Sequence, residues 1–256
     1  MERSLLSIDW DYFIYSEYES WGSLTENDRN LIDLWYKRYL QEKSRGKDIG
    51  KSFYLSGDLD RFWERIKNRF IFTEDIKVYV SDSHALSYDI AKEHNCTVVY
   101  LFDSHADLGY GGLSSLNFEV NCSNWLGKLL KDAQIRKANI IYSPYTSEKP
   151  EFFEALNSMY NIQYFESLED LDNKKELHNG KDLDNKSFDN SEQGKGIMVD
   201  AVHICRSGAW TPPWFDEKFM HFVNDLKVPY KIVNCPERSW DVTNIKFADQ
   251  VNYLLA

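Results

Sequence analysis

A segment that contains both aspartate and histidine follows a strongly apolar run near the middle of the chain. The residues VVYLFDSHADLGYGG lead from apolar side chains directly into Asp103, His105 and Asp107. In an extended segment alternate side chains point to the same side, so these three converge while Ser104 and Ala106 point away. Carboxylate and imidazole groups that converge on one point are ligands for a divalent metal ion.

Two further segments place similar groups at the ends of apolar runs. One is KVYVSDSHALSYDI, in which Asp82 and His84 precede a helical pattern; capping that helix is the alternative role for Asp82. The other is SLLSIDWDYF, in which Asp9 and Asp11 alternate with larger side chains and face one way. This D-x-D pattern also fits an edge strand with one face exposed to solvent. Because α/β folds build their sites at the carboxyl ends of strands, we expect the three segments to meet.

With Asp82 set aside as a helix cap, the three segments together supply four carboxylates and two imidazoles but no thiolate. Hard oxygen ligands combined with nitrogen suit Mn²⁺ best, with Fe²⁺, Co²⁺ or Zn²⁺ as alternatives. Four aspartates carry four negative charges, which two divalent ions neutralise and a single ion does not. The sequence therefore predicts a binuclear site, which would hold a hydroxide nucleophile at neutral pH.

The elements that must position these groups alternate between short β-branched runs and amphipathic stretches, which is typical of an α/β sandwich. Strands are expected over residues 5–8, 77–80, 97–102, 139–142, 163–165, 196–202 and 230–233. Helical patterns occupy residues 31–40, 59–70, 85–93, 124–131, 150–159, 215–226 and 245–254. The polar stretch 166–195 is expected to be an exposed loop, and residues 1–256 to form a single domain.

Composition limits the classes of protein that remain. A chain of 256 residues can bury a core without disulfides, and its four isolated cysteines, with no secretory pattern, predict a reduced, cytoplasmic protein. The mean hydropathy is −0.55, and no apolar run approaches the ~20 residues that a membrane span needs. A net charge of −11 repels phosphate, so we expect no nucleic-acid partner and a preference for cationic ligands.

The three acidic segments resemble the metal-binding motifs of ureohydrolases, the superfamily of arginases and agmatinases. SDSHALS looks like their G-G-D-H-S-L-A segment, LFDSHADLGY like D-A-H-x-D, and LSIDWDYF like S-F-D-x-D. The segments NCSNWLGKLL and HICRSGAWTPPWF make the resemblance closest to the peptide-arginase-like branch, which converts arginine to ornithine in ribosomally made peptides. The resemblance implies a three-layer α/β/α sandwich with a mostly parallel sheet. It also implies a manganese-dependent hydrolase that releases urea from an arginine-containing precursor peptide.

The resemblance further implies a role for each matched side chain. It gives two Mn²⁺ ions six ligands: His84 and Asp107 on one ion, His105 and Asp11 on the other, and Asp103 and Asp9 bridging both. Asp107 would also take a proton from the nucleophile for the leaving amine. Ordinary arginases carry D-x-D after D-x-H-x-D, so here its strand would be permuted to the N-terminus. The competitor at the usual place is GIMVDAVHICRSG, with Asp200 and His203.

Two further catalytic residues are expected by resemblance. Ordinary arginases use a loop histidine for proton transfer, but the matching stretch here, residues 121–125, contains none. His203 is the candidate substitute, with a packed strand-end histidine as the alternative. Glu237 resembles in position the acid that pairs with the substrate guanidinium, and a surface role is its alternative.

Other functions remain open at this stage. Within the same class the substrate could be free arginine or agmatine. An amide deacetylase would share the broad fold, but it normally uses one zinc and an adjacent histidine pair, which the sequence lacks. A non-catalytic protein with a structural ion is the third alternative. The small, glycine-rich rim after Asp107 and the tryptophans Trp125, Trp210 and Trp214 favour a peptide substrate, although core packing is the ordinary role of each tryptophan.

Overall fold

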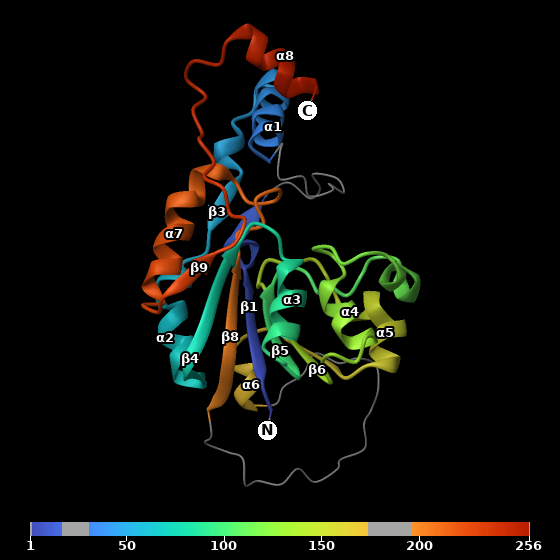
Figure 1. Cartoon of the computed structure of the whole chain (residues 1–256). Coiled ribbons are helices and arrows are strands. Elements are labelled where there is room, and N and C mark those ends of the chain that lie inside the picture. The colour runs from blue at the N-terminus through green and yellow to red at the C-terminus, as the bar shows by residue number, and fades with distance from the viewer. Residues whose placement is uncertain (1, 17–30, 174–195, 256) are drawn as a thin grey trace.

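The computed structural model describes residues 2–16, 31–173 and 196–255 (Figure 1). In these residues the strands of the central sheet are all parallel, in the order β7-β6-β5-β1-β8-β4-β9. Their bounds are β1 Ser4–Asp9, β4 Phe70–Ser81, β5 Val98–Asp103, β6 Lys137–Tyr142, β7 Ile162–Phe165, β8 Ile197–Cys205 and β9 Tyr230–Ile232. All seven expected strands are therefore confirmed.

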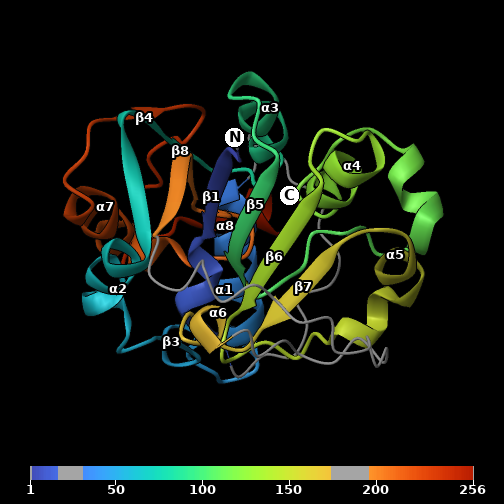
Figure 2. The ribbon, with the colours of Figure 1, turned by 90° about the horizontal axis from the view of Figure 1, so that it is seen from below.

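Helices cover both faces of this sheet (Figure 2). One face carries α3 Leu86–Glu93, α4 Trp125–Lys131 and α5 Glu154–Met159, and the other carries α2 Phe62–Arg69, α6 Asp170–Asn173 and α7 Asp216–Asp225. Two more helices, α1 Leu31–Ser44 and α8 Phe247–Leu255, pack on each other beyond the carboxyl edge of the sheet (Figure 1). This arrangement confirms the three-layer α/β/α sandwich.

Short 3₁₀ helices complete the described elements. They are η1 Trp10–Phe13, η2 Ile49–Lys51, η3 Leu59–Arg61, η4 Gly112–Asn117, η5 Pro150–Phe153 and η7 Pro213–Phe215. Within the described part of the chain, none of the helices combines the length and the apolar character that crossing a bilayer requires.

The central strands are buried on both faces, which is why they read as continuous apolar runs. Every residue of β1 and of β5 is buried. Leu6, Ile8 and Phe102 belong to the apolar cluster under α2 and α7, whereas Leu5 and Leu101 belong to the cluster under α3 and α4. Odd-numbered side chains of both strands thus face α3, and this parity carries Asp9 and Asp103 to the same side.

The N-terminal strand β1 lies in the middle of the sheet, between β5 and β8. From β1 the chain crosses to β4 on one side, and from β5 it continues to β6 on the other side. Adjacent strands whose connections run in opposite directions define a topological switch point, where α/β folds place ligands. The ends of β1 and β5, at Asp9 and Asp103, form that point.

The sequence did not predict the antiparallel ribbon of β2 Ile14–Ser16 and β3 Phe53–Leu55. Three residues are too few to show a period of two, so neither strand could be distinguished from a loop.

The prediction of an exposed loop over residues 166–195 is wrong for its first residues. Residues 174–195 lie outside the described part of the chain. Leu168 and Leu171 are buried, with 6% and 8% of their surface exposed, and they join the cluster under α2 and α7. A spacing of three brings both leucines to one side of a helical turn, so they cover apolar surface in spite of their polar neighbours.

Candidate metal centre

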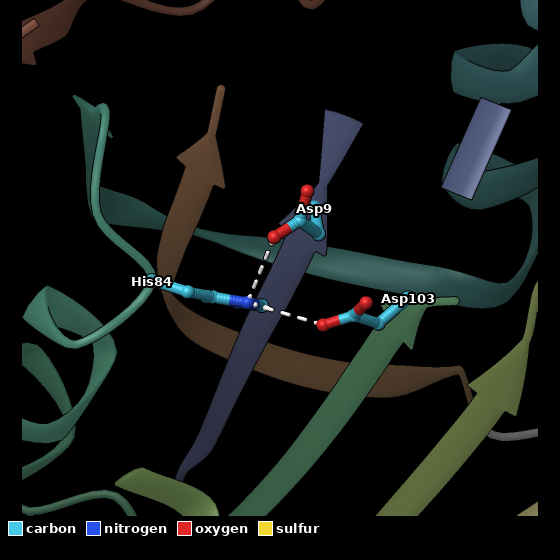
Figure 3. Close-up of side chains that lie close together, drawn as sticks. All are labelled: Asp9, His84 and Asp103. Atoms are coloured by element: carbon cyan, nitrogen blue, oxygen red, sulfur yellow. Dashed lines mark ion pairs between the residues drawn. The ribbon is translucent and has the colours of Figure 1, made fainter. Parts of the chain in front are cut away.

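The six side chains expected as metal ligands meet at the carboxyl edge of the sheet. Figure 3 shows three of them, Asp9, His84 and Asp103. Asp9 and Asp103 are the last residues of β1 and β5, and His84 comes from the loop between β4 and α3. The ligand atoms fall into two groups that share Asp103, namely Asp9 with His84 and Asp11 with His105. Residues far apart in the chain thus converge because parallel strands end at one edge.

The inner group surrounds the imidazole of His84. Its Nδ1 lies 3.1 Å from Asp9 Oδ2, 3.1 Å from Asp103 Oδ2 and 3.0 Å from Asp107 Oδ2, and all four residues are buried. Neither His84 Nδ1 nor Asp103 Oδ2 makes a hydrogen bond of acceptable geometry. Buried polar atoms are rarely left without a hydrogen-bond partner. A cation among these three oxygens and one nitrogen would satisfy both atoms, so the donor set fits a metal ion.

The outer group is open to solvent. His105 Nδ1 lies 3.0 Å from Asp11 Oδ2 and 3.5 Å from Asp103 Oδ1. The His105 side chain is 49% exposed, whereas that of Asp103 is 1% exposed. Asp103 therefore presents one oxygen to a buried histidine and the other to an accessible one.

Backbone amides orient the carboxylates of both groups. Asp9 Oδ1 accepts a hydrogen bond from the Asp11 amide at 3.0 Å, and Asp103 Oδ1 accepts one from the His105 amide at 2.8 Å. Asp11 Oδ1 accepts from the Ser104 amide at 3.2 Å. The turn after each of β1 and β5 thus orients the carboxylate at the end of its own strand, and the turn after β5 also orients Asp11.

Two positions of the site have left-handed backbone. Asp107 has a φ of 50° and Ser207 a φ of 51°, a conformation that is uncommon for residues other than glycine and that concentrates at functional sites. Asp107 Oδ2 accepts a hydrogen bond of 2.6 Å from Trp125 Nε1, and Ser207 donates its hydroxyl proton to Asp9 Oδ2. Trp125 and Ser207 therefore hold the Asp107 and Asp9 carboxylates of the inner group in place.

Burial and mutual repulsion perturb the pKa values of the aspartates. Burial raises the pKa of Asp103 well above its ordinary value, and the carboxylates of Asp11, Asp107 and Asp9 raise it further. Burial and Asp11 also raise the pKa of Asp9. Burial would raise the pKa of Asp11 too, but His105 outweighs it and lowers that pKa. Carboxylates so close together are stable only with protons or cations among them.

The two histidines respond in the opposite way to burial. Burial alone would lower the pKa of His84, yet the close carboxylates of Asp103, Asp107 and Asp9 raise it well above its ordinary value. Partial desolvation would lower the pKa of the half-exposed His105 as well, but Asp11 and Asp103 raise it well above 6.5. Without a metal ion the cluster therefore holds protons at neutral pH, and a metal ion would have to displace them.

The structure corrects the proton-transfer role expected for His203. The side chain is fully buried, with Nε2 2.8 Å from Ser81 Oγ and Nδ1 2.6 Å from Ser87 Oγ. Burial and the nearby His84 lower its pKa well below the ordinary value. A neutral ring with both nitrogens hydrogen-bonded and no solvent contact is unsuited to exchange a proton with a substrate.

Asp200, the alternative to Asp9, lies at the opposite edge of the sheet. Its Oδ2 accepts a hydrogen bond from the Ser4 amide at 2.9 Å, and its Oδ1 is 3.2 Å from Arg3 Nε. The register pairs Asp9 with Cys205, five residues beyond Asp200 on β8. The structure therefore brings the D-x-D segment, and not Asp200, into the cluster.

Glu237, the expected partner of a guanidinium, is exposed and belongs to neither ligand group. Its neighbour Arg238 turns inward and forms an ion pair with Asp216. Asp82 does not cap α3, whose N-cap is Ala85. Its carboxylate instead forms a two-pronged ion pair with Arg206, at 2.7 Å and 2.6 Å.

These residues form a buried network of alternating charge beside the inner group. Arg206 contacts Asp82 and Asp216, and Arg238 contacts Asp216 and the carbonyl oxygens of Gly208 and Thr211. Two positive and two negative charges balance one another, and the carbonyl bonds satisfy remaining donors. The network fixes the turn after β8 that carries Ser207.

Glu148 is a site residue that sequence analysis missed. Its Oε2 accepts hydrogen bonds from the Ala106 amide at 2.7 Å and the Tyr142 hydroxyl at 3.1 Å, and its Oε1 accepts from the Tyr110 hydroxyl at 2.6 Å. Burial raises the pKa of Glu148. The carboxylate holds the turn between His105 and Asp107, but it lies in a loop without motif or periodicity.

Two of the tryptophans expected to line a groove pack against the core, Trp125 fully buried and Trp214 partly buried. Trp125 is fully buried against Asp107. The ring of Trp214 packs between Trp35, Phe53 and Trp240, at centroid distances of 5.5, 5.8 and 5.4 Å. Core packing, the ordinary role of a tryptophan, therefore describes both.

Comparison of this chain with models of protein families, with curated proteins and with solved structures found no match. Fold and site define its class by themselves. It is an α/β protein with a parallel sheet and an Asp–His cluster, placed at the topological switch point, that could hold a metal ion. That description is compatible with the ureohydrolase resemblance.

Proposed function

We propose that this protein is a manganese-dependent hydrolase that converts arginine residues of a precursor peptide to ornithine and releases urea. One observation carries the proposal: Asp103 faces the buried His84 with one oxygen and the accessible His105 with the other. Such a carboxylate suits two cations held side by side, one enclosed and one open to a substrate.

Each proposed ion position has its own ligands and two that are shared. The inner position would take His84 and Asp107, the outer would take His105 and Asp11, and Asp103 belongs to both groups. The second shared ligand, Asp9, lies in the inner group and is given its bridging role by the resemblance. Two divalent ions would neutralise the four carboxylates and, once bound, supply a nucleophilic water and electrostatic stabilisation of the transition state. The oxygen-rich donor set without thiolates favours Mn²⁺.

The proposed reaction is hydrolysis of a guanidinium group. The oxygen of water bonds to the guanidinium carbon, and the bond from that carbon to the side-chain nitrogen breaks. The nitrogen leaves as an amine only after it gains a proton, so a general acid is needed. We assign this role to Asp107, whose carboxylate lies beside His84 and is oriented by Trp125.

Exposed tyrosines beside the outer group support a peptide as the substrate. Tyr15, Tyr54 and Tyr145 are 43%, 47% and 43% exposed, with ring centroids of Tyr15 6.1 Å from Tyr54 and 5.6 Å from Tyr145. Thr146 binds the loop of Tyr145 to the Ser104 carbonyl, next to His105. Rigid aromatic surface suits an extended chain, and the net charge of −11 favours a basic one.

A substrate panel tests the proposal. Manganese-loaded protein is incubated with arginine-containing peptides, free arginine, agmatine and an acetyl-lysine peptide. We expect urea together with a mass loss of CN₂H₂ in the arginine peptides, and little turnover of the others. Urea from free arginine or agmatine alone would indicate a small-molecule ureohydrolase, and acetate release would indicate a deacetylase. Asp103→Asn should be inactive on every substrate, and Asp200→Asn, at the far edge of the sheet, is the matched control.

A further inference from the structure

A row of buried polar side chains lies behind His84, on the face of the sheet that α3 covers. It consists of Ser7 on β1, Ser87 on α3, His203 on β8 and Ser81 on β4, all at most 2% exposed. Hydrogen bonds connect them in sequence: His84 Nε2 to Ser7 Oγ at 2.7 Å, Ser7 Oγ to Ser87 Oγ at 2.8 Å, Ser87 Oγ to His203 Nδ1 at 2.6 Å, and His203 Nε2 to Ser81 Oγ at 2.8 Å. We call these four residues the polar row.

The far end of the polar row sets the direction of its hydrogen bonds. Ser81 Oγ donates to the Ser83 carbonyl oxygen at 2.8 Å, and a carbonyl can only accept. A hydroxyl has one proton, so Ser81 must accept from His203 Nε2. A neutral imidazole that donates from Nε2 has a bare Nδ1, which accepts from Ser87.

The same reasoning continues to the metal site. Because the Ser87 proton points at His203, Ser87 Oγ accepts from the Ser7 hydroxyl. Because the Ser7 proton points at Ser87, Ser7 Oγ accepts from His84 Nε2. His84 therefore carries a ring proton on Nε2, and Nδ1, which lies 3.0 to 3.1 Å from the carboxylates of the inner group, is the ring nitrogen left to bind a cation once any proton on it has been displaced.

We infer that the polar row fixes the tautomer of His84 in which Nδ1 is the metal ligand. The inference rests on the proposed function, since it concerns the same inner position. It makes His203 a positioning residue that acts on the site through Ser87 and Ser7. Every link is needed: without Ser87, the Ser7 hydroxyl is free to turn and donate to His84 Nε2, which moves the ring proton to Nδ1 and blocks the ligand atom.

Metal affinity of matched variants tests the inference. Partners that orient a metal-binding histidine typically contribute about 10–100-fold to affinity. We expect Ser87→Ala and His203→Leu to weaken Mn²⁺ binding in equilibrium dialysis by about this factor. His203→Gln should recover most of the loss, because its amide offers both an acceptor oxygen and a donor nitrogen.

Two control variants remove comparable hydrogen bonds outside the polar row. Ser143→Ala removes a buried hydroxyl that donates to the Tyr12 carbonyl at 2.8 Å, and His94→Gln changes a histidine 2.9 Å from the Tyr79 hydroxyl. Both should bind Mn²⁺ as the wild type does. Circular dichroism and melting temperature identify any variant whose binding fails because the fold is lost.

A second measurement needs no variant. In the wild-type protein with ¹⁵N-labelled histidine and Zn²⁺ as a diamagnetic probe, nitrogen chemical shifts should place the proton of both His84 and His203 on Nε2. A proton on His84 Nδ1 or His203 Nδ1, or unchanged Mn²⁺ affinity in folded Ser87→Ala, would show that the polar row does not fix the tautomer of His84. The proposed metal site itself would not be affected by that result. A wild-type protein that binds no metal at all would overturn the proposed function and this inference together.

Discussion

His84 Nδ1 lies 3.1 Å from Asp103 Oδ2 in fully buried surroundings, and neither atom makes a hydrogen bond of acceptable geometry. Proteins seldom bury two such atoms in this way without a third group between them. Since Asp103 also faces His105 through its second oxygen, the same carboxylate connects an enclosed position with an open one. The chemistry that we propose depends on this connection.

Replacing Asp103 should remove both ions. In Asp103→Asn the amide cannot serve two cations as a carboxylate does, so we expect metal content by elemental analysis to fall from two ions per chain to none at micromolar free Mn²⁺. Asp200→Asn should keep both ions, because Asp200 pairs with Arg3 at the other edge of the sheet. Loss of metal in Asp200→Asn with retention in Asp103→Asn would contradict our assignment.

Metal binding should release protons and become stronger as pH rises. The carboxylates raise the pKa values of His84 and His105 well above 6.5, so both rings hold a proton more tightly in the metal-free protein than a free imidazole does. Ions must displace about two protons from these rings. We expect calorimetric binding enthalpies to vary with the ionisation enthalpy of the buffer, and affinity to rise between pH 6 and pH 8. An affinity independent of pH would contradict this description.

Removal of metal should lower stability, and more so at higher pH. Ions at a free concentration of 100 Kd contribute about 2.7 kcal/mol to the free energy of unfolding, which corresponds to a rise in Tm of roughly 5–10 °C. In the metal-free protein, raised pKa values of His84 and His105 mean that the folded state binds more protons than the unfolded state. Its stability is therefore lost as pH rises above 6.5. Thermal melts with and without chelator should diverge from pH 6 to pH 8, and equal melts would exclude a shared site.

The ion pair of Asp82 with Arg206 should contribute far more to stability than a surface pair of the same kind. Asp82→Asn leaves the buried Arg206 guanidinium without its main counter-charge, and we expect a loss of about 3–5 kcal/mol in the free energy of unfolding. Glu169→Gln alters the exposed two-pronged pair with Arg65 and should cost about 0–1 kcal/mol. Urea titrations of both variants measure the difference, and similar losses would show that burial of the network is unimportant.

Local pattern was sufficient to predict the strands of the sheet and the convergence of the Asp and His side chains at their ends. Strand β5 is buried on both faces and reads as an unbroken apolar run, and alternation then places Asp103 and Asp9 on the same side. The short strands of the ribbon and the burial of Leu168 and Leu171 depend on what packs against them, which the local sequence does not contain.

The choice between Asp9 and Asp200, and the role of His203, required strand register. Asp200 and Asp9 both stand in apolar strands, but only the pairing of Asp9 with Cys205 shows that Asp200 lies five residues short of the site. A strand-end histidine looks the same whether it faces a substrate or, as His203 does, two serines from β4 and α3. Glu148 lies in a loop, and its contacts to Ala106 and Tyr110 arise only from the fold.

The most direct measurement of the central claim is electron paramagnetic resonance during titration of the protein with Mn²⁺. If Asp103 connects two ions, binding should saturate at two Mn²⁺ per chain, and the spectrum at saturation should show exchange coupling between them. Asp103→Asn should abolish the coupled signal, whereas Asp200→Asn should keep it. Saturation at one ion, or two ions with the spectrum of isolated Mn²⁺, would contradict the binuclear site on which the proposed hydrolysis depends.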